Sequence, residues 1–304
     1  MSAPPRLFDR QLLAARRNRA AQGREIGGFA QAHFLRARAI EDTLLTLGAI
    51  NRHFDLVLDM AAADGGFGRA LAESDAAGKV GLLIEGELSP RLLAQASGPA
   101  RLVMDEESLP FGDDGFNLVV SVLGLHGVND LPGVLVQVRR ALKDDGLFIA
   151  SLFGGGTLAE LRACLMEAEL EVRGGYGPRI SPFAEAPDLI DLLKRIGFTM
   201  PVVDSDRVEV SYAHPLRLLQ DLRAMGEGNV LFERPRIGLN RAILARMSEI
   251  YFARHADAEG RIIASFEIIT LSGWKAHESQ QKPLRPGSAK MKLADALGVR
   301  EGKL

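Results

Sequence analysis

Short apolar runs alternate with amphipathic segments through the middle of the chain. Runs of four to eight mainly apolar residues begin at positions 54, 80, 101, 116 and 146, and segments with helical periodicity lie between most of them. Continuous apolar runs of this length are typical of strands that are buried on both faces of a sheet. Strands that alternate with helices predict parallel βαβ units with right-handed crossovers. The pattern therefore predicts an α/β protein.

The two ends of the chain have different patterns. We expect residues 1–50, which carry two helical segments and many arginines, to form an N-terminal arm or lid, with the second helix ending at Gly48. Residues 51–275 hold the predicted strands and a helical insertion around 213–258. Residues 276–304 combine proline, glycine and serine with polar residues and predict a C-terminal tail that is loop or disordered.

Composition narrows the classes of function. The 304 residues are 47% hydrophobic and 25% charged, and the formal net charge of -2 gives no basic excess for nucleic acid. A single cysteine, Cys164, excludes an intrachain disulfide and a cysteine-rich zinc site, which fits a reducing compartment. No apolar run approaches the roughly 18 residues of a membrane helix. We therefore expect a cytoplasmic protein without stable membrane insertion.

Three acidic residues fall at the ends of the first three predicted strands: Asp59, Glu85 and Asp105. Ligands of open α/β sheets bind outside the carboxyl ends of the strands. Glu85 can accept hydrogen bonds from ribose hydroxyls, and Asp105 from the exocyclic amine of adenine. Asp59 can order the following loop or meet an amino group. The alternative is that these acids only cap helices and solvate loops.

The sequence of the loop after the first strand discriminates between NAD and S-adenosylmethionine as candidate cofactors. A dinucleotide site would need G-x-G-x-x-G, whereas glycine occurs here only from position 65 onward, which argues against NAD. The loop is similar to the D-x-G-x-G-x-G motif of class I methyltransferases, with Asp59, Ala61, Ala63 and Gly65 at the matching positions. This resemblance implies a Rossmann-like fold, a mostly parallel seven-stranded sheet with helices on both faces, and S-adenosylmethionine as cofactor. Because two alanines replace glycines, loss of the cofactor stays open as the alternative.

Further motifs resemble one family more closely. They are LFDR at 7–10, DEESLPF at 105–111, LHGVNDLP at 125–132, FGGGTLAELR at 153–162, ISPF at 180–183, MGEGN at 225–229 and GWKAHESQ at 273–280. They resemble the mitochondrial complex I assembly factors that hydroxylate an arginine of an iron–sulfur subunit, and their alphaproteobacterial relatives. More distant relatives are the biotin-pathway methyltransferases that esterify an acyl-carrier thioester. Here Gly127 stands where the family has a tryptophan, which removes an aromatic wall near the expected site.

Candidate catalytic chemistry lies after the fourth strand. Ser121 ends this strand and is expected to face the cofactor, and His126 could serve as a general base because its ordinary pKa lies near neutrality. Equally, His126 could pack on the next helix and cap it, while Asp130 is a candidate N-cap for that helix. The pair His277 and Glu278 could bind a metal or a partner, but two potential ligands are a weak signal for a metal site. Arginine hydroxylation needs an activated oxygen source, and no local two-histidine, one-carboxylate motif provides a site for one.

Three hypotheses follow. The first is an S-adenosylmethionine-binding enzyme of the complex I assembly family that modifies a protein side chain, with an iron–sulfur subunit of respiratory complex I as the implied partner. The second is a methyltransferase that acts on a small acyl or quinone-like molecule. The third is an assembly chaperone that kept the fold and lost the cofactor.

Overall fold

The computed structural model describes residues 6–23, 32–278 and 280. Parts of the expected arm (1–5 and 24–31) and tail (279 and 281–304) lie outside the described residues. The helices and strands are α1 (Arg10–Ala20), α3 (Phe34–Ala49), β1 (Phe54–Met60), α4 (Gly66–Ala72), β2 (Val80–Glu87), α5 (Pro90–Leu93), β3 (Ala100–Val103), β4 (Phe116–Val122), α6 (Leu131–Ala141), β5 (Leu142–Phe153), α7 (Ala159–Arg173), α8 (Ala186–Ile196), β6 (Phe198–Tyr212), α9 (Pro215–Ala224), α10 (Arg241–His255) and β7 (Ile262–Lys275). Short 3-10 turns lie at Ala77–Lys79 and Leu125–Gly127.

The strands form one seven-stranded sheet in the order β3-β2-β1-β4-β5-β7-β6. The four pairings from β3 to β5 are parallel, while β7 pairs antiparallel with both β5 and β6. The expected α/β fold is therefore confirmed, but the sheet is mixed, and its description as mostly parallel holds only loosely. The chain order reverses between β1 and β4, and this switch point is where open α/β sheets bind ligands.

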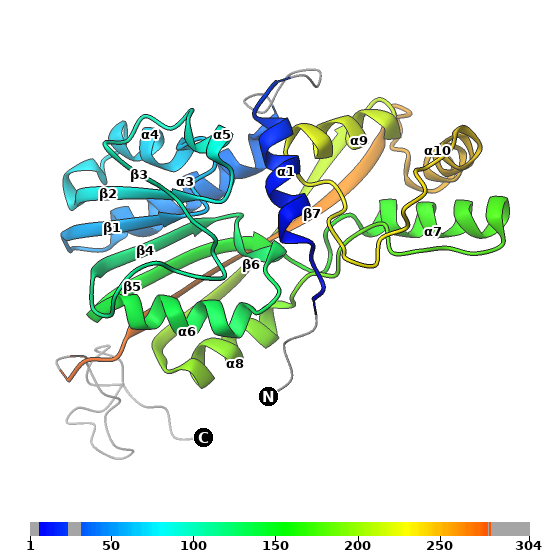
Figure 1. Cartoon of the computed structure of the whole chain (residues 1–304). Coiled ribbons are helices and arrows are strands. Elements are labelled where there is room, and N and C mark those ends of the chain that lie inside the picture. Colours follow the sequence, from blue (N-terminus) through cyan, green and yellow to red (C-terminus); the bar gives the residue numbers. More distant parts are fainter. Residues whose placement is uncertain (1–5, 24–31, 279, 281–304) are drawn as a thin grey trace, which may run out of the picture.

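Helices cover both faces of the sheet (Figure 1). Helices α3, α4, α7 and α10 bury apolar residues in one core, and helices α6 and α8 do so in another. Successive residues of a strand point to opposite faces, so Val57 of β1 enters the first core and Leu58 the second. This burial on both faces explains the continuous apolar runs of the central strands.

Two regions of the chain lie outside the parallel part of the sheet: helix α1 and the segment 213–258. Helix α1 runs across the front of the molecule in Figure 1, between the parallel strands and the lobe formed by α7, α9 and α10. The segment 213–258, expected as a helical insertion, contains α9 and α10. No helix in the described part of the chain is long and apolar enough to cross a membrane.

Some local predictions were wrong. Helix α3 does not end at Gly48 but continues to Ala49, and the N–H of Ile50 donates to the carbonyl of Leu47 at 3.2 Å. A Cβ added at Gly48 would meet no atom of the described residues within 4 Å, so no contact there demands glycine. Asp130 does cap α6, because its carboxylate accepts from the Gly133 N–H at 2.9 Å. His126 therefore does not serve as that cap.

Candidate active site

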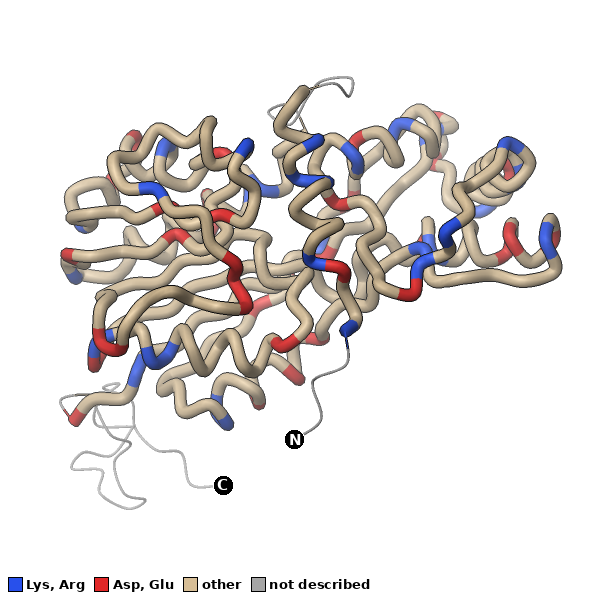
Figure 2. Tube along the Cα trace, viewed as in Figure 1, with Lys and Arg blue, Asp and Glu red and all other residues tan. Residues whose placement is uncertain are grey.

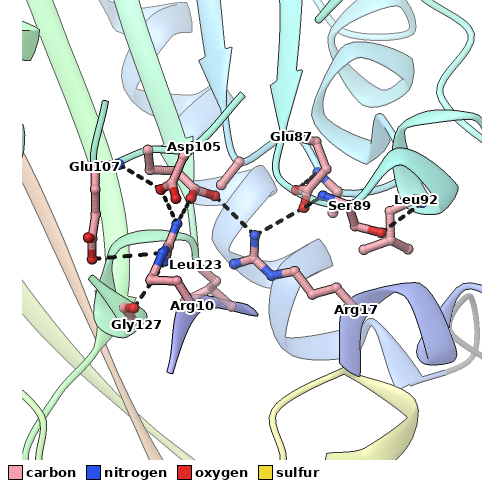
Figure 3. A network of polar contacts seen from close by, with 12 residues as sticks. Arg10, Arg17, Glu87, Ser89, Leu92, Asp105, Glu107, Leu123 and Gly127 are labelled. Carbon is pink, nitrogen blue, oxygen red and sulfur yellow. Dashed lines mark hydrogen bonds and ion pairs between the residues drawn. The ribbon is translucent and has the colours of Figure 1, made fainter. Parts of the chain in front are cut away.

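Two arginines fix helix α1 over the ends of β2 and β3 (Figure 3). Arg17 is only 6% exposed, and its Nη1 donates to Glu87 Oε1 and Glu106 Oε1, both at 3.0 Å. Arg10 donates to Asp105 Oδ1 at 2.6 Å and also contacts Glu106. The arginines are two helical turns apart and share one face of α1. Because Glu87 and Glu106 are fully buried, these ion pairs compensate charges that would otherwise be costly.

Glu87 also connects the loops that follow β1 and β2. Its Oε2 accepts from the Ala63 N–H at 3.0 Å, and its Oε1 accepts from the Ser89 N–H at 2.8 Å. Ser89 in turn caps the short helix α5 through the Leu92 N–H. One carboxylate therefore joins the expected cofactor loop, helix α5 and, through Arg17, helix α1.

The loop after β1 contains two alanines in a conformation that favours glycine. Ala61 and Ala63 have φ of 65° and 55°, and Gly65 follows with φ of 77°. A left-handed backbone costs an L-residue about 1–2 kcal/mol because its Cβ approaches the carbonyl oxygen. The loop thus keeps the shape of a glycine motif although two glycines are replaced. The Ala61 methyl lies against Gly124, where a Cβ would come within 2.4 Å of it.

Asp59, the acid expected to order the loop or meet an amino group, ends β1 in a fully buried position. Neither of its carboxylate oxygens has a hydrogen-bond partner among the described residues. Burial raises the pKa of Asp59 to about 8, against the opposing effect of Arg36. Arg36 itself donates to the carbonyls of Ala61 and Leu123, at 3.3 and 3.5 Å. Among the described residues, the Asp59 carboxylate therefore does not order the loop through hydrogen bonds.

Ser121 resembles Asp59 in its surroundings. Its hydroxyl is fully buried at the end of β4, and its Oγ lacks a hydrogen-bond partner within the described residues. A buried polar group without a partner is unusual in a folded protein, because desolvation is not compensated. β1 pairs directly with β4, with Asp59 opposite Val120. Two orphaned polar side chains thus end neighbouring strands at the topological switch point.

Glu85 lies directly opposite Asp59 in the sheet register, but it does not end β2 as expected, because the strand continues to Glu87. Its Oε2 accepts from the Gly98 N–H at 3.0 Å, and burial raises its pKa although this hydrogen bond and Arg101 oppose the shift. A Cβ at Gly65 or Gly98 would lie 2.7 or 2.3 Å from this carboxylate. The glycines therefore let two loops close onto Glu85, which leaves it 1% exposed.

Asp105, the expected adenine acceptor, follows β3. Its Oδ1 accepts from Arg10 and, at 2.9 Å, from the Glu107 N–H, while its side chain stays 36% exposed. Asp105 is thus already engaged by helix α1.

His126 forms a dyad with a residue far away in the sequence. Its Nε2 lies 3.0 Å from Glu227 Oε2, and its buried Nδ1 has no hydrogen-bond partner among the described residues. The ring packs 4.8 Å from that of Phe153, at the end of β5. Burial would raise the pKa of Glu227, but His126 and the positive charges of Arg17 and Arg36 outweigh it and lower this pKa. A carboxylate that orients an imidazole is a common device of general-base catalysis.

A large cavity of about 580 Å³ adjoins this dyad. Its walls are mainly apolar, with Phe153, Leu161 and Phe266 among them, and arginines also line it. A second, small cavity of about 30 Å³ shares Arg17, Phe153 and Glu227 with it and reaches Ala63. The dyad therefore stands between a substrate-sized space and the loop after β1.

The chemical character of these residues suits S-adenosylmethionine. Asp59 and Ser121 present buried polar atoms that lack partners, and the loop from Ala61 to Gly65 has the backbone shape of a glycine motif. Glu85, the acid expected to hold the ribose, lies opposite Asp59 in the sheet register but is enclosed by the loops around Gly65 and Gly98. Binding a nucleoside thus requires these loops to separate.

No group of three metal-ligating side chains lies together within the described residues.

Sequence reasoning found the residues at the strand ends and missed those that contact them. Arg17, Glu87 and Glu106 form the central ion pairs, and Glu227 orients His126. The signals were present as arginines seven positions apart at 10 and 17, a run of acids from Asp105, and a glutamate between glycines at 226 and 228. None of these patterns says which partner each side chain meets.

Comparison with solved structures places the fold. The chain is similar to YcgJ of Bacillus subtilis, with a TM-score of 0.53 and 15% identity over 79% of this chain and 99% of that one. A candidate methyltransferase from Bacillus halodurans gives a TM-score of 0.54 at 15% identity, over 78% of this chain and 98% of that one. Residues 49–150 match the family model described as a methyltransferase domain. The chain therefore has the class I methyltransferase fold, with a methyltransferase-type domain matched over residues 49–150.

Curated relatives identify the family. The human arginine-hydroxylase NDUFAF5, mitochondrial, is 36% identical over 95% of this chain and 83% of its own length. Its zebrafish counterpart is 44% identical, over 68% of this chain and 64% of its own length. A malonyl-[acyl-carrier protein] O-methyltransferase of Halorhodospira halophila is 30% identical over 86% of this chain and 88% of its own length. The chain belongs to the NDUFAF5 arginine-hydroxylase family, which confirms the resemblance drawn from its motifs.

Proposed function

We propose that the chain binds S-adenosylmethionine across the ends of β1, β2 and β4 and modifies a protein side chain held in the large cavity. The orphaned, buried carboxyl of Asp59 carries this proposal, because a ligand ammonium would supply the partner that it lacks. Ser121 would offer a further polar contact, and Glu85 would accept from the ribose hydroxyls. The backbone from Ala61 to Gly65 would lie against the ligand.

Adenine recognition by Asp105 would use a carboxylate that Arg10 already contacts. Its Oδ1 is held by Arg10, so the amine of adenine would either share the carboxylate through Oδ2 or replace the arginine. When bound, S-adenosylmethionine supplies an activated methyl group on its sulfonium. Calorimetric titration with S-adenosylmethionine and S-adenosylhomocysteine tests the binding step, and the absence of heat at millimolar ligand would contradict it.

His126 would act as a general base beside the large cavity. Glu227 orients its imidazole through Nε2, so the buried Nδ1 is the nitrogen left to accept a proton from a substrate group. Glu227→Gln would keep the shape of the dyad and remove its charge. We expect turnover to fall with the substrate KM nearly unchanged, whereas equal turnover in this variant would remove the dyad from the mechanism.

The proposed substrate is an arginine of an iron–sulfur subunit of respiratory complex I. Similarity to the arginine hydroxylases over 95% of the chain supports this choice. The mass of the iron–sulfur subunit from a strain that lacks this protein tests the proposed substrate, because the arginine of that subunit should be unmodified in this strain. An unchanged arginine mass in that strain would exclude this substrate. We propose the cytoplasm as the compartment, although these relatives are named as mitochondrial proteins.

A small acyl substrate is the second candidate. The apolar walls of the large cavity favour it, as does the similarity to a malonyl-[acyl-carrier protein] O-methyltransferase. Transfer of a labelled methyl group from S-adenosylmethionine to an acyl thioester would support this function. The closed loops around Glu85 favour the third hypothesis, a chaperone without cofactor, which gains support if the titrations show no binding.

A further inference from the structure

A cluster of arginines lies apart from the carboxylates at the sheet edge. Arg16 and Arg19 project from α1, and Arg223 from the last turn of α9. The three line a cavity of about 190 Å³ together with Gly226 and Gly228. Figure 2 shows basic residues on α1 and on the neighbouring α9. No ion pair joins any of the three arginines to a carboxylate in the described ranges 6–23, 32–278 and 280.

The position of Arg16 shows that the cluster is built into the fold. Its Nε is buried without a hydrogen-bond partner among the described residues. A Cβ at Gly228 would lie 1.8 Å from its Nη1, so the absence of a side chain at Gly228 makes room for the guanidinium. Gly226 has φ of 83°, and this left-handed turn carries the chain from α9 to Gly228.

Within the part of the chain that the structure describes, no ion pair balances the charges of this cluster. Burial lowers the pKa of Arg16, and the positive charges of Arg234, Arg19 and Arg223 lower it further. Asp9 acts in the opposite direction, but its carboxylate pairs with Arg234 at 3.3 Å. Helix dipoles favour cations in the last turns that hold Arg19 and Arg223, yet Arg16 lies inside α1 and gains little from this effect.

We propose that Arg16, Arg19 and Arg223 bind an oxyanion group, a phosphate or a carboxylate, of a small ligand. Guanidinium groups present paired N–H donors that match such groups, and three of them around one cavity would neutralise more than one negative charge. The cavity shares Arg16, Arg223 and Gly228 with the large cavity beside His126. The body of the ligand would thus lie in the large cavity while its anionic end is held at α1 and α9.

Calorimetric titration of the full chain with pyrophosphate, and separately with citrate, at low ionic strength tests the site. We expect one equivalent of at least one of these anions to bind. Arg16→Gln should weaken that binding about ten-fold or more, because a charge-assisted contact is lost. The anion affinity of Arg16→Lys should lie between those of the original chain and Arg16→Gln, since lysine keeps the charge without the paired donors. Arg195→Gln, which changes an exposed arginine on α8, should bind as the original chain does.

Thermal melting without added anion gives a second readout. Arg16→Gln should unfold at a higher temperature than the original chain at low salt, because like charges are no longer forced together, and Arg195→Gln should not. Equal anion affinity in the original chain and Arg16→Gln would overturn the proposal. The proposal would also be overturned if an acidic peptide bound to the cluster and neither pyrophosphate nor citrate did, because the cluster would then belong to a protein partner.

The site does not depend on the proposed cofactor. Arg16→Gln should keep its affinity for S-adenosylhomocysteine, since none of the three arginines contacts Asp59, Glu85 or Ser121. If the chain binds no S-adenosylhomocysteine, the pyrophosphate and citrate titrations still decide whether the arginine cluster binds anions.

Discussion

Replacing Asp59 by asparagine should change how the stability of the protein depends on pH. The carboxyl is fully buried without a hydrogen-bond partner in the described residues, and its pKa rises from 3.8 to about 8 on folding. Between these values the folded chain keeps a proton that the unfolded chain has released. Raising the pH through this window therefore lowers the free energy of unfolding.

The size of the effect follows from the same two pKa values. Each pH unit between them costs the folded chain about 1.4 kcal/mol. The interval from 3.8 to pH 7 is a little over three units, so the upper limit at pH 7 is about 4 kcal/mol. Local rearrangement and water entry reduce this figure, and we expect a measured loss of about 2–4 kcal/mol.

Urea unfolding at half-unit steps from pH 5 to pH 8.5 measures this dependence. The free energy of unfolding of Asp59→Asn minus that of the original chain should grow by up to about 1.4 kcal/mol per unit to pH 7, and level off above pH 8. Asp55→Asn on the same strand, where the side chain is exposed, is the matched control and should leave the pH profile unchanged. A constant difference across the range would refute the assignment of a neutral, buried Asp59.

Three further changes probe the site. Arg17→Met should lower the free energy of unfolding by about 3–5 kcal/mol, because buried Glu87 loses the arginine that pairs with it and buried Glu106 keeps only Arg10. Urea unfolding beside the exposed control Arg140→Met measures this loss, and equal losses in the two variants would mean that the buried ion pairs add no stability. Glu85→Ala should weaken S-adenosylhomocysteine binding by on the order of 1–3 kcal/mol in calorimetry, whereas unaltered affinity would remove Glu85 from ribose binding. Gly65→Ala should cost about 1–3 kcal/mol of stability, because φ is 77° and its Cβ would meet Glu85. Thermal unfolding measures this loss, and an unfolding temperature equal to that of the original chain would contradict it.

The sequence predicts the sheet well because its strands are buried on both faces. Continuous apolar runs need no partner to be recognised, and each of the five expected runs contains or overlaps a parallel strand. The meeting of Asp59 and Glu85 also follows, since parallel neighbours bring their carboxyl ends to one edge. Element ends were less predictable. Gly48 resembles a helix stop, yet α3 continues past it without needing a left-handed residue.

The contacts of the site could not be predicted because they join distant parts of the chain. Arg17 meets Glu87 from 70 residues away, and Glu227 reaches His126 from 101 residues away. Pairing of this kind depends on where α1 and α9 pack, which the local pattern does not specify. The same packing brings Arg10 to Asp105, so that a residue chosen for adenine is held by the N-terminal helix.

Binding of S-adenosylhomocysteine as a function of pH tests the central proposal most directly. If the ligand ammonium meets Asp59, binding requires the ionised carboxylate, and the association constant should rise about ten-fold per unit from pH 6 towards pH 8. The ligand should also release close to one proton per molecule bound near pH 6.5, and Asp59→Asn should release none. No binding at millimolar ligand, or binding with the same affinity at pH 6 and pH 8, would contradict a cofactor seated on Asp59.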